Sequence, residues 1–297
     1  MILIKLNKTA DTACLFLTAL IWGLTFVWQL QASDVLGTFT FISVRFFLGA
    51  VSLIPVIYIF ERDPVTAKDY KITVLAGIAA GLILFTAASL QQIGIAYTGS
   101  AGKAGFITGL YMILVPVLGV FFGRKTSVLT WAGAVSAVLG LYLLSVQNAS
   151  SIEAGDIILF IGAFFWAGHI FIIDRFAKRI KVIRFSMVQF ITCGVLSAAC
   201  ALIFENITLS GISDGIVPIL FCGLLSTGLA YTLQIIGQKG VDPPKAAIIF
   251  SLETLFSAIG GAILLGEKMS TRGYAGCAFI FAGIIVSQIT VNRKAIC

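Results

Sequence analysis

Long uncharged runs of residues between charged flanks constrain this chain more than any other feature. Residues 157–173 contain no Asp, Glu, Lys or Arg and lie between Asp156 and Asp174, and residues 185–204 form a second such run. A bilayer core of about 30 Å is crossed by about 20 apolar residues in an α-helix. Charged residues make up only 11% of the chain, against about 25% in soluble domains. The sequence therefore predicts an integral membrane protein.

Charged flanks separate ten predominantly apolar segments. They span residues 12–30, 38–60, 72–97, 104–123, 128–147, 157–173, 185–204, 216–238, 246–265 and 273–292. Backbone groups that face lipid must form hydrogen bonds within their own segment, which favours helices. The expected fold class is an all-α integral membrane protein with ten transmembrane helices.

Lysine and arginine are distributed unevenly between the two sides that this topology defines. With the N-terminus inside, the inner segments hold sixteen of them and the outer segments hold three. Positive residues stay on the cytoplasmic side, so we expect both termini to be cytoplasmic in a multi-pass protein of the plasma membrane, the inner membrane in a bacterium. The formal net charge of +7 reflects this bias and does not indicate nucleic-acid binding.

The two halves of the chain match at a nearly constant offset. The pairs at an offset of 144 are Trp22 and Trp166, Thr25 and His169, and Arg45 and Gln189. At an offset of 143, Leu110 pairs with Glu253. Each half holds five segments, an odd number, so the second half enters the membrane from the opposite side. Such inverted repeats are typical of transporters with a site near the midplane. We expect two five-helix repeats, at residues 1–150 and 151–297.

Four stretches carry a resemblance to a known family. They are "ALIWGLTFVW" in the first segment, "SVRFFLGA" in the second, "SAGKAGFITGLYMILVPVLG" in the fourth and "SLETLFSAIGGAILLGEKMS" in the ninth. With them the chain resembles the EamA-type branch of the drug/metabolite transporter (DMT) superfamily over nearly its whole length. In that family a proline usually follows the glutamate of the last motif. Thr254 stands there in this chain, so the usual helix-breaking residue is missing.

This resemblance implies a fold and a class of function. It implies ten helices in two inverted five-helix repeats around a central cavity. Spans 1–4 and 6–9 would line the cavity, and spans 5 and 10 would be peripheral. The implied substrates are amino acids and other small metabolites, which such proteins commonly export.

Arg45 places a permanent cation about 10 Å into the second segment. A charge at this depth is costly and is expected to face the protein interior. One interpretation is an anion clamp that binds a substrate carboxylate or phosphate through two hydrogen bonds. The other is a structural brace that bonds helix-end carbonyls or an acid. The sequence leaves both open.

Glu253 is the other ionisable residue at depth, about 14 Å into the ninth segment. One hypothesis is that its carboxylate alternates between a proton and a substrate amine, which would couple transport to the proton gradient. The alternative is a neutral acid that forms a hydrogen bond between helices.

Several uncharged residues and one lysine lie at depths that suit a cavity. Trp22 and Trp166 fall near the midplane, and Thr25 and His169 lie one helical turn from them; simple packing is the alternative for all four. Lys103 is expected either to meet a substrate carboxylate or to extend toward water. The remaining candidates are hydrogen-bonding groups that can serve a substrate or hold helices together, namely Gln91, Tyr111, Gln189, Tyr231 and Gln234.

Pro116 removes a backbone donor inside the fourth segment, and we expect it to act as a hinge. The stretch "GAILLGEK" has the glycines of a phosphate loop, but Glu267 stands where that loop needs lysine. The sequence predicts no metal site, no cofactor and no ATPase partner.

Together these features predict a secondary active transporter, not an enzyme. It would move small polar metabolites, with amino acids as the expected substrates, by alternating access. Arg45 would hold the substrate carboxylate and Glu253 the ammonium, while Trp22 and Trp166 would pack the side chain. Export is the expected direction, and proton coupling is a further hypothesis. The alternatives are a flippase for lipid-linked substrates, a drug/metabolite efflux pump of the same superfamily, and an intramembrane enzyme.

Overall fold

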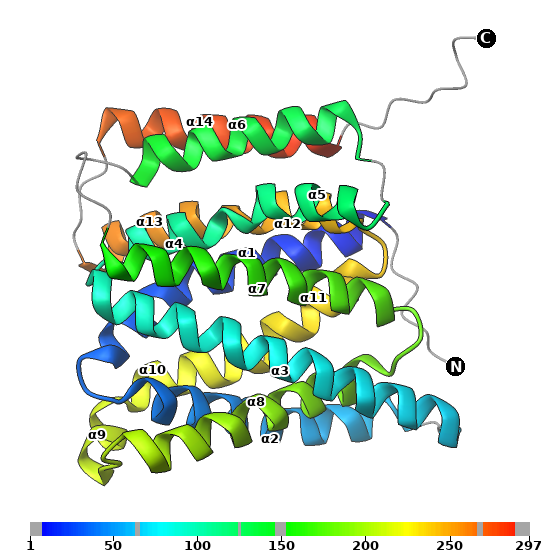
Figure 1. Cartoon of the computed structure of the whole chain (residues 1–297), viewed down its shortest axis with the longest axis vertical. Helices are drawn as coiled ribbons and strands as arrows, with labels where there is room; N and C mark the ends of the chain where they lie inside the picture. The colour runs from blue at the N-terminus through cyan, green and yellow to red at the C-terminus, as the bar shows by residue number, and fades with distance from the viewer. Residues whose placement is uncertain (1–7, 63–65, 124–125, 146–152, 266–269, 289–297) are drawn as a thin grey trace.

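The computed structural model describes residues 8–62, 66–123, 126–145, 153–265 and 270–288. These residues form helices and no strand (Figure 1), which confirms the all-α fold class. The helices, in chain order, are α1 (Lys8–Ser33), α2 (Thr38–Phe60), α3 (Ala67–Thr98), α4 (Ala101–Gly109), α5 (Tyr111–Phe121), α6 (Val128–Ser145), α7 (Ala154–Phe176), α8 (Val182–Phe204), α9 (Leu209–Asp214), α10 (Ile216–Leu220), the π-helix η1 (Phe221–Ala230), α11 (Tyr231–Gln238), α12 (Pro243–Phe250), α13 (Leu252–Leu265) and α14 (Thr271–Gln288).

Each predicted segment overlaps one of these helices or a consecutive group of them. Among the described residues, seven helical stretches are long and apolar enough to cross a membrane. The fifth and tenth segments correspond to α6 and α14, whose apolar parts, Val128–Leu143 and Thr271–Ser287, are shorter. The count of ten spans therefore stays a prediction. The predicted repeat boundary at 150/151 and the phosphate-loop-like residues 266–268 lie outside the described residues.

A pair of helices, α6 and α14, packs side by side at one edge of the molecule (Figure 1). A Cβ atom on Gly133 of α6 would lie 2.5 Å from the carbonyl oxygen of Gly283 on α14, and a Cβ on Gly283 would lie 2.5 Å from that of Gly133. Facing small residues let two backbones approach this closely. The pair occupies the edge position that the family resemblance implies for spans 5 and 10.

The opposite edge contains α2 and α8 (Figure 1). A glutamate joins them at one end. Glu61 directly follows α2 and accepts hydrogen bonds from two backbone N–H groups at the start of α8. These come from Ile183 at 3.0 Å and Arg184 at 3.1 Å. A carboxylate at a helix N-terminus pairs with free N–H donors and with the positive end of the helix dipole. The end of α2 thus caps the beginning of α8.

The same arrangement occurs in reverse at the other end of this pair. Glu205 directly follows α8 and accepts hydrogen bonds from the N–H groups of Phe39 at 2.7 Å and Thr40 at 2.8 Å, near the start of α2. Glu61 and Glu205 are themselves 144 residues apart. Each helix therefore ends in an acid that caps the other, as expected for equivalent helices that run in opposite directions.

Removing one of these caps should destabilise the fold. We expect Glu205→Ala to lower the free energy of unfolding by about 1–2 kcal/mol, because the N–H groups of Phe39 and Thr40 lose their partner. The midpoint of thermal unfolding in detergent measures this loss. Asp214→Ala is the control, since Asp214 is an exposed acid near the same end, and it should change stability by less than about 0.5 kcal/mol. Equal effects of the two changes would contradict the capping role.

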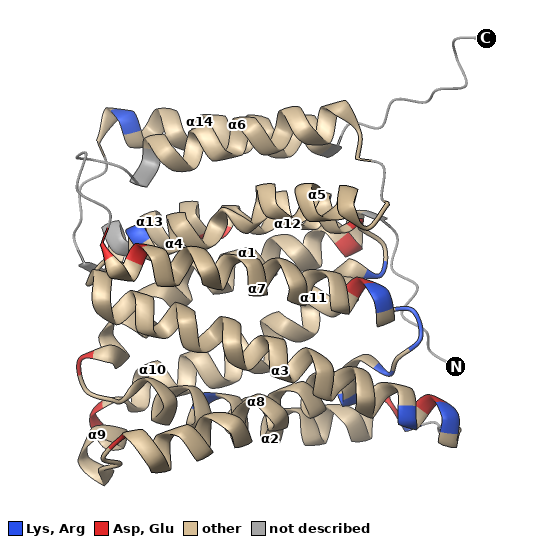
Figure 2. Cartoon of the chain, viewed as in Figure 1, with Lys and Arg blue, Asp and Glu red and all other residues tan. Residues whose placement is uncertain are grey.

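Lys and Arg gather at the end of the bundle where α1 begins (Figure 2). Lys103 and Arg272 are the described exceptions, because they lie in the first turns of α4 and α14, which begin at the other end. This distribution follows the predicted charge bias, in which the end that carries the N-terminus has most of the positive residues.

Two segments are interrupted near their middle. Leu110 separates α4 from α5, and Ser251 separates α12 from α13. The second interruption forms without the family's proline: the Ser251 hydroxyl donates to the carbonyl oxygen of Ile248 at 2.6 Å, a local bond that competes with the regular helix. Pro116 lies inside α5, six residues after the interruption. Its predicted role as a hinge is not tested by this geometry.

Candidate binding cavity

A cavity lies between helices of both halves of the chain. Its volume is about 30 Å³ in this conformation. Its lining residues are Trp22, Thr25, Phe26, Gln29, Arg45, Gln91, Thr108, Tyr111, Trp166, Ile170, Ser226, Tyr231, Gln234, Phe250 and Glu253. All of them are buried except Trp22, which is half-buried. The lining residues therefore lie in the interior of the bundle.

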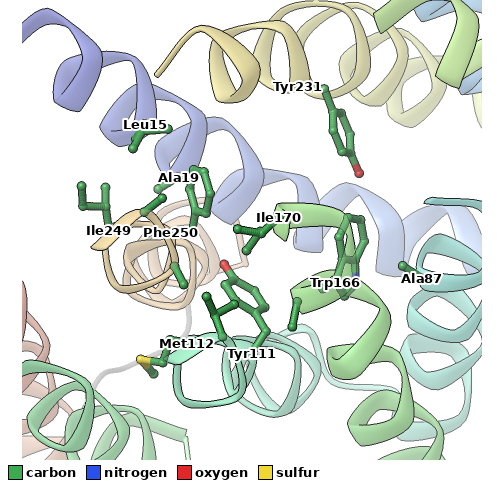
Figure 3. Packing of buried hydrophobic residues seen from close by; sticks show 14 of the residues in the cluster. Leu15, Ala19, Ala87, Tyr111, Met112, Trp166, Ile170, Tyr231, Ile249 and Phe250 are labelled. Carbon is green, nitrogen blue, oxygen red and sulfur yellow. The ribbon is translucent and has the colours of Figure 1, made fainter. Parts of the chain in front are cut away.

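Aromatic rings form much of the cavity wall. The Trp22 ring lies 4.8 Å from the ring of Tyr231, 5.4 Å from Phe250 and 6.3 Å from Trp166, measured between centroids. Trp166 and Tyr231 are nearly parallel, with an angle of 24° between their planes. Figure 3 shows Tyr111 and Tyr231 entering this region from opposite sides, with Ile170 between them. Such a wall suits the apolar part of a small ligand.

Arg45 projects from α2 and lines the cavity with only 3% of its surface exposed. Its guanidinium carbon lies 5.1 Å from the ring centroid of Phe41 and 5.0 Å from that of Phe46, so cation–π contacts offset part of the cost of burial. Among the described residues no carboxylate lies within 4.0 Å of the guanidinium, and its Nε has no hydrogen-bond partner.

Glu253 brings a carboxylate to the same cavity from α13. It is 4% exposed, and its Oε1 accepts a hydrogen bond from the Tyr111 hydroxyl at 3.1 Å. In the described part of the chain no Lys, Arg or His is paired with it. One cavity thus contains a cation and an acid that are not paired with each other.

Amides connect two helices at the end of the cavity away from the N-terminus. The Gln29 side chain on α1 donates to the side-chain oxygen of Gln91 on α3 at 3.4 Å, and the Gln92 amide donates to the backbone oxygen of Gln29 at 3.0 Å. Other buried polar groups of the lining have no partner within the described residues. They are Trp22 Nε1, Arg45 Nε, Thr108 Oγ1, Trp166 Nε1 and Gln234 Oε1. Buried groups of this kind are costly unless a ligand or water satisfies them.

The cavity brings together most of the residues that the sequence suggested. Those that line it are Trp22, Thr25, Arg45, Gln91, Tyr111, Trp166, Tyr231, Gln234 and Glu253. Three others do not. Lys103 instead bridges α4 to the start of α7, with its Nζ 3.0 Å from Glu153 and 2.9 Å from Asp156.

His169 and Gln189 lie behind the cavity wall. They are fully buried, and His169 Nε2 lies 3.0 Å from Gln189 Oε1. The imidazole meets the rings of Trp166 and Tyr231 edge-on, at 6.1 and 6.0 Å between centroids. The pair therefore supports two wall residues rather than lining the cavity.

Six lining residues were not among the sequence candidates: Phe26, Gln29, Thr108, Ile170, Ser226 and Phe250. Five of them lie about one turn from a candidate on the same segment, so helical spacing could have found them. Ser226 lies in η1, where the π-helix changes the residue spacing. A 3.6-residue repeat cannot predict which side chains face inward there.

The model of the EamA-like transporter family matches the chain twice, over residues 12–146 and 153–288. This chain belongs to the EamA-like transporter family. Within the DMT superfamily it is similar to an uncharacterized transporter of Archaeoglobus fulgidus, at 29% identity over 93% of this chain and 85% of the relative. The uncharacterized transporter YwfM of Bacillus subtilis is 24% identical over 94% of this chain and 93% of its own length.

The fold of this EamA-like transporter also matches a solved crystal structure. The TM-score is 0.78 at 18% identity, over 95% of this chain and 97% of the other, which supports the fold alone. Both named relatives are described as transporters. In the described residues no group of three or more His, Cys, Asp or Glu could hold a metal ion.

Proposed function

We propose that this EamA-like transporter is a secondary active transporter of amino acids. The observation that carries the proposal is the pair of charges in one cavity. The Arg45 guanidinium and the Glu253 carboxylate both line it, and neither has an oppositely charged partner among the described residues. An amino acid presents a carboxylate and an ammonium, so it satisfies both groups with charge-assisted hydrogen bonds.

The substrate is held at three places. Its carboxylate binds Arg45 and its ammonium binds Glu253, while its side chain packs against the rings of Trp22 and Trp166. Thr25, Gln91, Tyr231 and Gln234 supply neutral hydrogen-bonding groups around these contacts.

Transport proceeds by alternating access across the plasma membrane, through ten spans in two inverted repeats. The reciprocal caps of Glu61 and Glu205 support the inverted relationship. The buried lining supports a site inside the bundle, between the two halves. We place both termini in the cytoplasm because Lys and Arg gather at that end (Figure 2), and we propose export as the physiological direction.

Counterflow in proteoliposomes tests this function. Vesicles that contain the purified protein are loaded with a single unlabelled amino acid, and entry of the same labelled amino acid is measured for each of the twenty. We expect accumulation for at least one amino acid. Two analogues of that amino acid are used as competitors, one without the carboxylate and one without the amino group. Each should compete at least about tenfold less well than the amino acid itself. Equal competition by either analogue, or transport of a lipid-linked sugar alone, would contradict the proposal.

Glu253→Gln tests the proposed coupling to protons. Glutamine keeps the shape of the side chain but cannot carry a proton or a negative charge. We expect wild-type transport to respond to an imposed pH gradient and the variant to lose that response, measured by labelled uptake with and without the gradient. Glu153→Gln is the control, because Glu153 is an exposed acid outside the cavity. A variant at position 253 with normal rate and unchanged response would exclude the coupling role.

A further inference from the structure

Tyr111 and Glu253 meet where the two interrupted segments cross. Tyr111 is the first residue of α5, immediately after the break at Leu110, and Glu253 is the second residue of α13, just after Ser251. They come from different halves of the chain. At the repeat offset of 143, Glu253 corresponds to Leu110 and Thr254 corresponds to Tyr111. Only one of the two equivalent positions therefore carries a carboxylate.

Within the described residues, two hydrogen bonds join these segments, one to a side-chain acceptor and one to a backbone acceptor. Tyr111 Oη donates to Glu253 Oε1 at 3.1 Å. Thr254 Oγ1 donates to the backbone oxygen of Gly105 on α4 at 3.0 Å. The acceptor of the first bond is a side chain that lines the cavity, while the acceptor of the second is a backbone carbonyl. Loss of the second bond loosens the contact between the halves without changing what the carboxylate meets.

Tyr111 is the one hydrogen-bond partner that the described residues provide for the Glu253 carboxylate. The tyrosine ring is itself fixed, because it is 3% exposed and belongs to the main hydrophobic cluster. Figure 3 shows it extending from α5 into the interior between Phe250 and Ile170. A rigid donor on one oxygen of a carboxylate limits rotation of the group and so determines where the second oxygen points.

We propose that Tyr111 is the positioning residue for Glu253, and that its hydroxyl orients the carboxylate to receive the ammonium of the substrate. This inference rests on the proposed amino-acid function. The half of the chain that contains α5 thereby controls a binding group that belongs to the other half. The binding site is complete only when α5 and α13 lie in the relative position that allows this hydrogen bond.

Infrared difference spectroscopy of the purified protein tests the hydrogen bond without any substrate. The Glu253 band is identified by its disappearance in Glu253→Gln. We expect Tyr111→Phe to shift that band and Thr254→Val to leave it in place. Thr254→Val is the matched control, since it removes the neighbouring bond between the same two segments. An unmoved band in Tyr111→Phe, or an equal shift in both variants, overturns the proposal.

Binding then separates positioning from a general structural role. Binding is measured by the quenching of tryptophan fluorescence, because Trp22 and Trp166 line the cavity. The protein is titrated with L-leucine and with 4-methylpentanoate, which is leucine without its amino group. We expect Tyr111→Phe to weaken the binding of leucine about tenfold relative to that of the analogue. Thr254→Val should leave the ratio of the two dissociation constants unchanged. A loss that is equal for both ligands overturns the positioning role. If wild type binds neither ligand and shows no counterflow, the proposed function fails, and the infrared result still decides the role of Tyr111.

Discussion

Replacing Arg45 with glutamine is expected to reduce amino-acid counterflow by at least about 100-fold. Two hydrogen bonds from a charged donor contribute about 3 kcal/mol or more together, which corresponds to at least about 100-fold in binding. The protein should nevertheless fold. Arg45 is buried without a carboxylate partner among the described residues, so its removal leaves no opposite charge unpaired and relieves a desolvation cost. The lost contacts with Phe41 and Phe46 offset part of that gain.

This result decides between the two interpretations of Arg45. If the arginine clamps a substrate anion, Arg45→Gln loses transport at an unchanged unfolding temperature, and Arg45→Lys retains an intermediate activity because it keeps the charge without the two-pronged geometry. If it braces the helices, the unfolding temperature falls along with transport. Arg184→Gln is the control, because Arg184 lies at the start of α8 beside Glu61, outside the cavity. It should transport normally.

A single methyl group at Gly23 should be enough to disable the protein. A Cβ atom there would lie 2.5 Å from both the Glu253 carbonyl oxygen and the Cβ of Phe256. Neither atom is the end of a flexible side chain, so α1 and α13 must separate. Overpacking of this kind costs about 1–3 kcal/mol. We also expect Gly23→Ala to lower the rate of counterflow more than about tenfold. Trp22 and Glu253 lie next to this contact between α1 and α13, and a displacement of about 1 Å at a binding site is enough to lower the rate strongly.

Gly102→Ala is the matched control for this change. Nothing lies within 4 Å of the position that its Cβ would take, and alanine favours the helix of α4 over glycine. The unfolding temperature of Gly102→Ala should equal or exceed that of wild type, with normal counterflow. Similar behaviour of the two alanine variants would show that the close approach of α1 and α13 is not required.

Helix positions and burial depth could be read from the sequence because they depend on local chemistry. A membrane-spanning helix needs a set number of apolar residues, and depth follows from the rise of 1.5 Å per residue. Trp22 and Trp166 were placed near the midplane on this basis, and Arg45 and Glu253 about 10 Å and 14 Å into their segments. The structure brings all four to one cavity. The repeat offset also anticipated that both halves would contribute to it.

Rotation about the helix axis was harder to predict. Thr25 and His169 are equivalent in the repeat, yet only Thr25 lines the cavity, since the longer imidazole reaches Gln189 on α8. Depth along a helix does not determine which neighbour a side chain faces. The partner of Lys103 was equally hard to predict. Its position in the fourth segment allowed a contact with the substrate, but its ammonium group instead pairs with two acids at the start of α7.

The sequence by itself determined the apolar helices and the depth of the two buried charges, because each depends on a short stretch of residues. It also determined the doubled architecture, because the repeat is a pattern along the chain. Contacts between distant residues needed the three-dimensional arrangement. Glu61 and Glu205 look like ordinary helix-end acids in the sequence, and their pairing with α8 and α2 depends on how those helices pack. The bond from Tyr111 to Glu253 likewise spans 142 residues. Such contacts depend on the relative placement of whole helices, which no local pattern encodes.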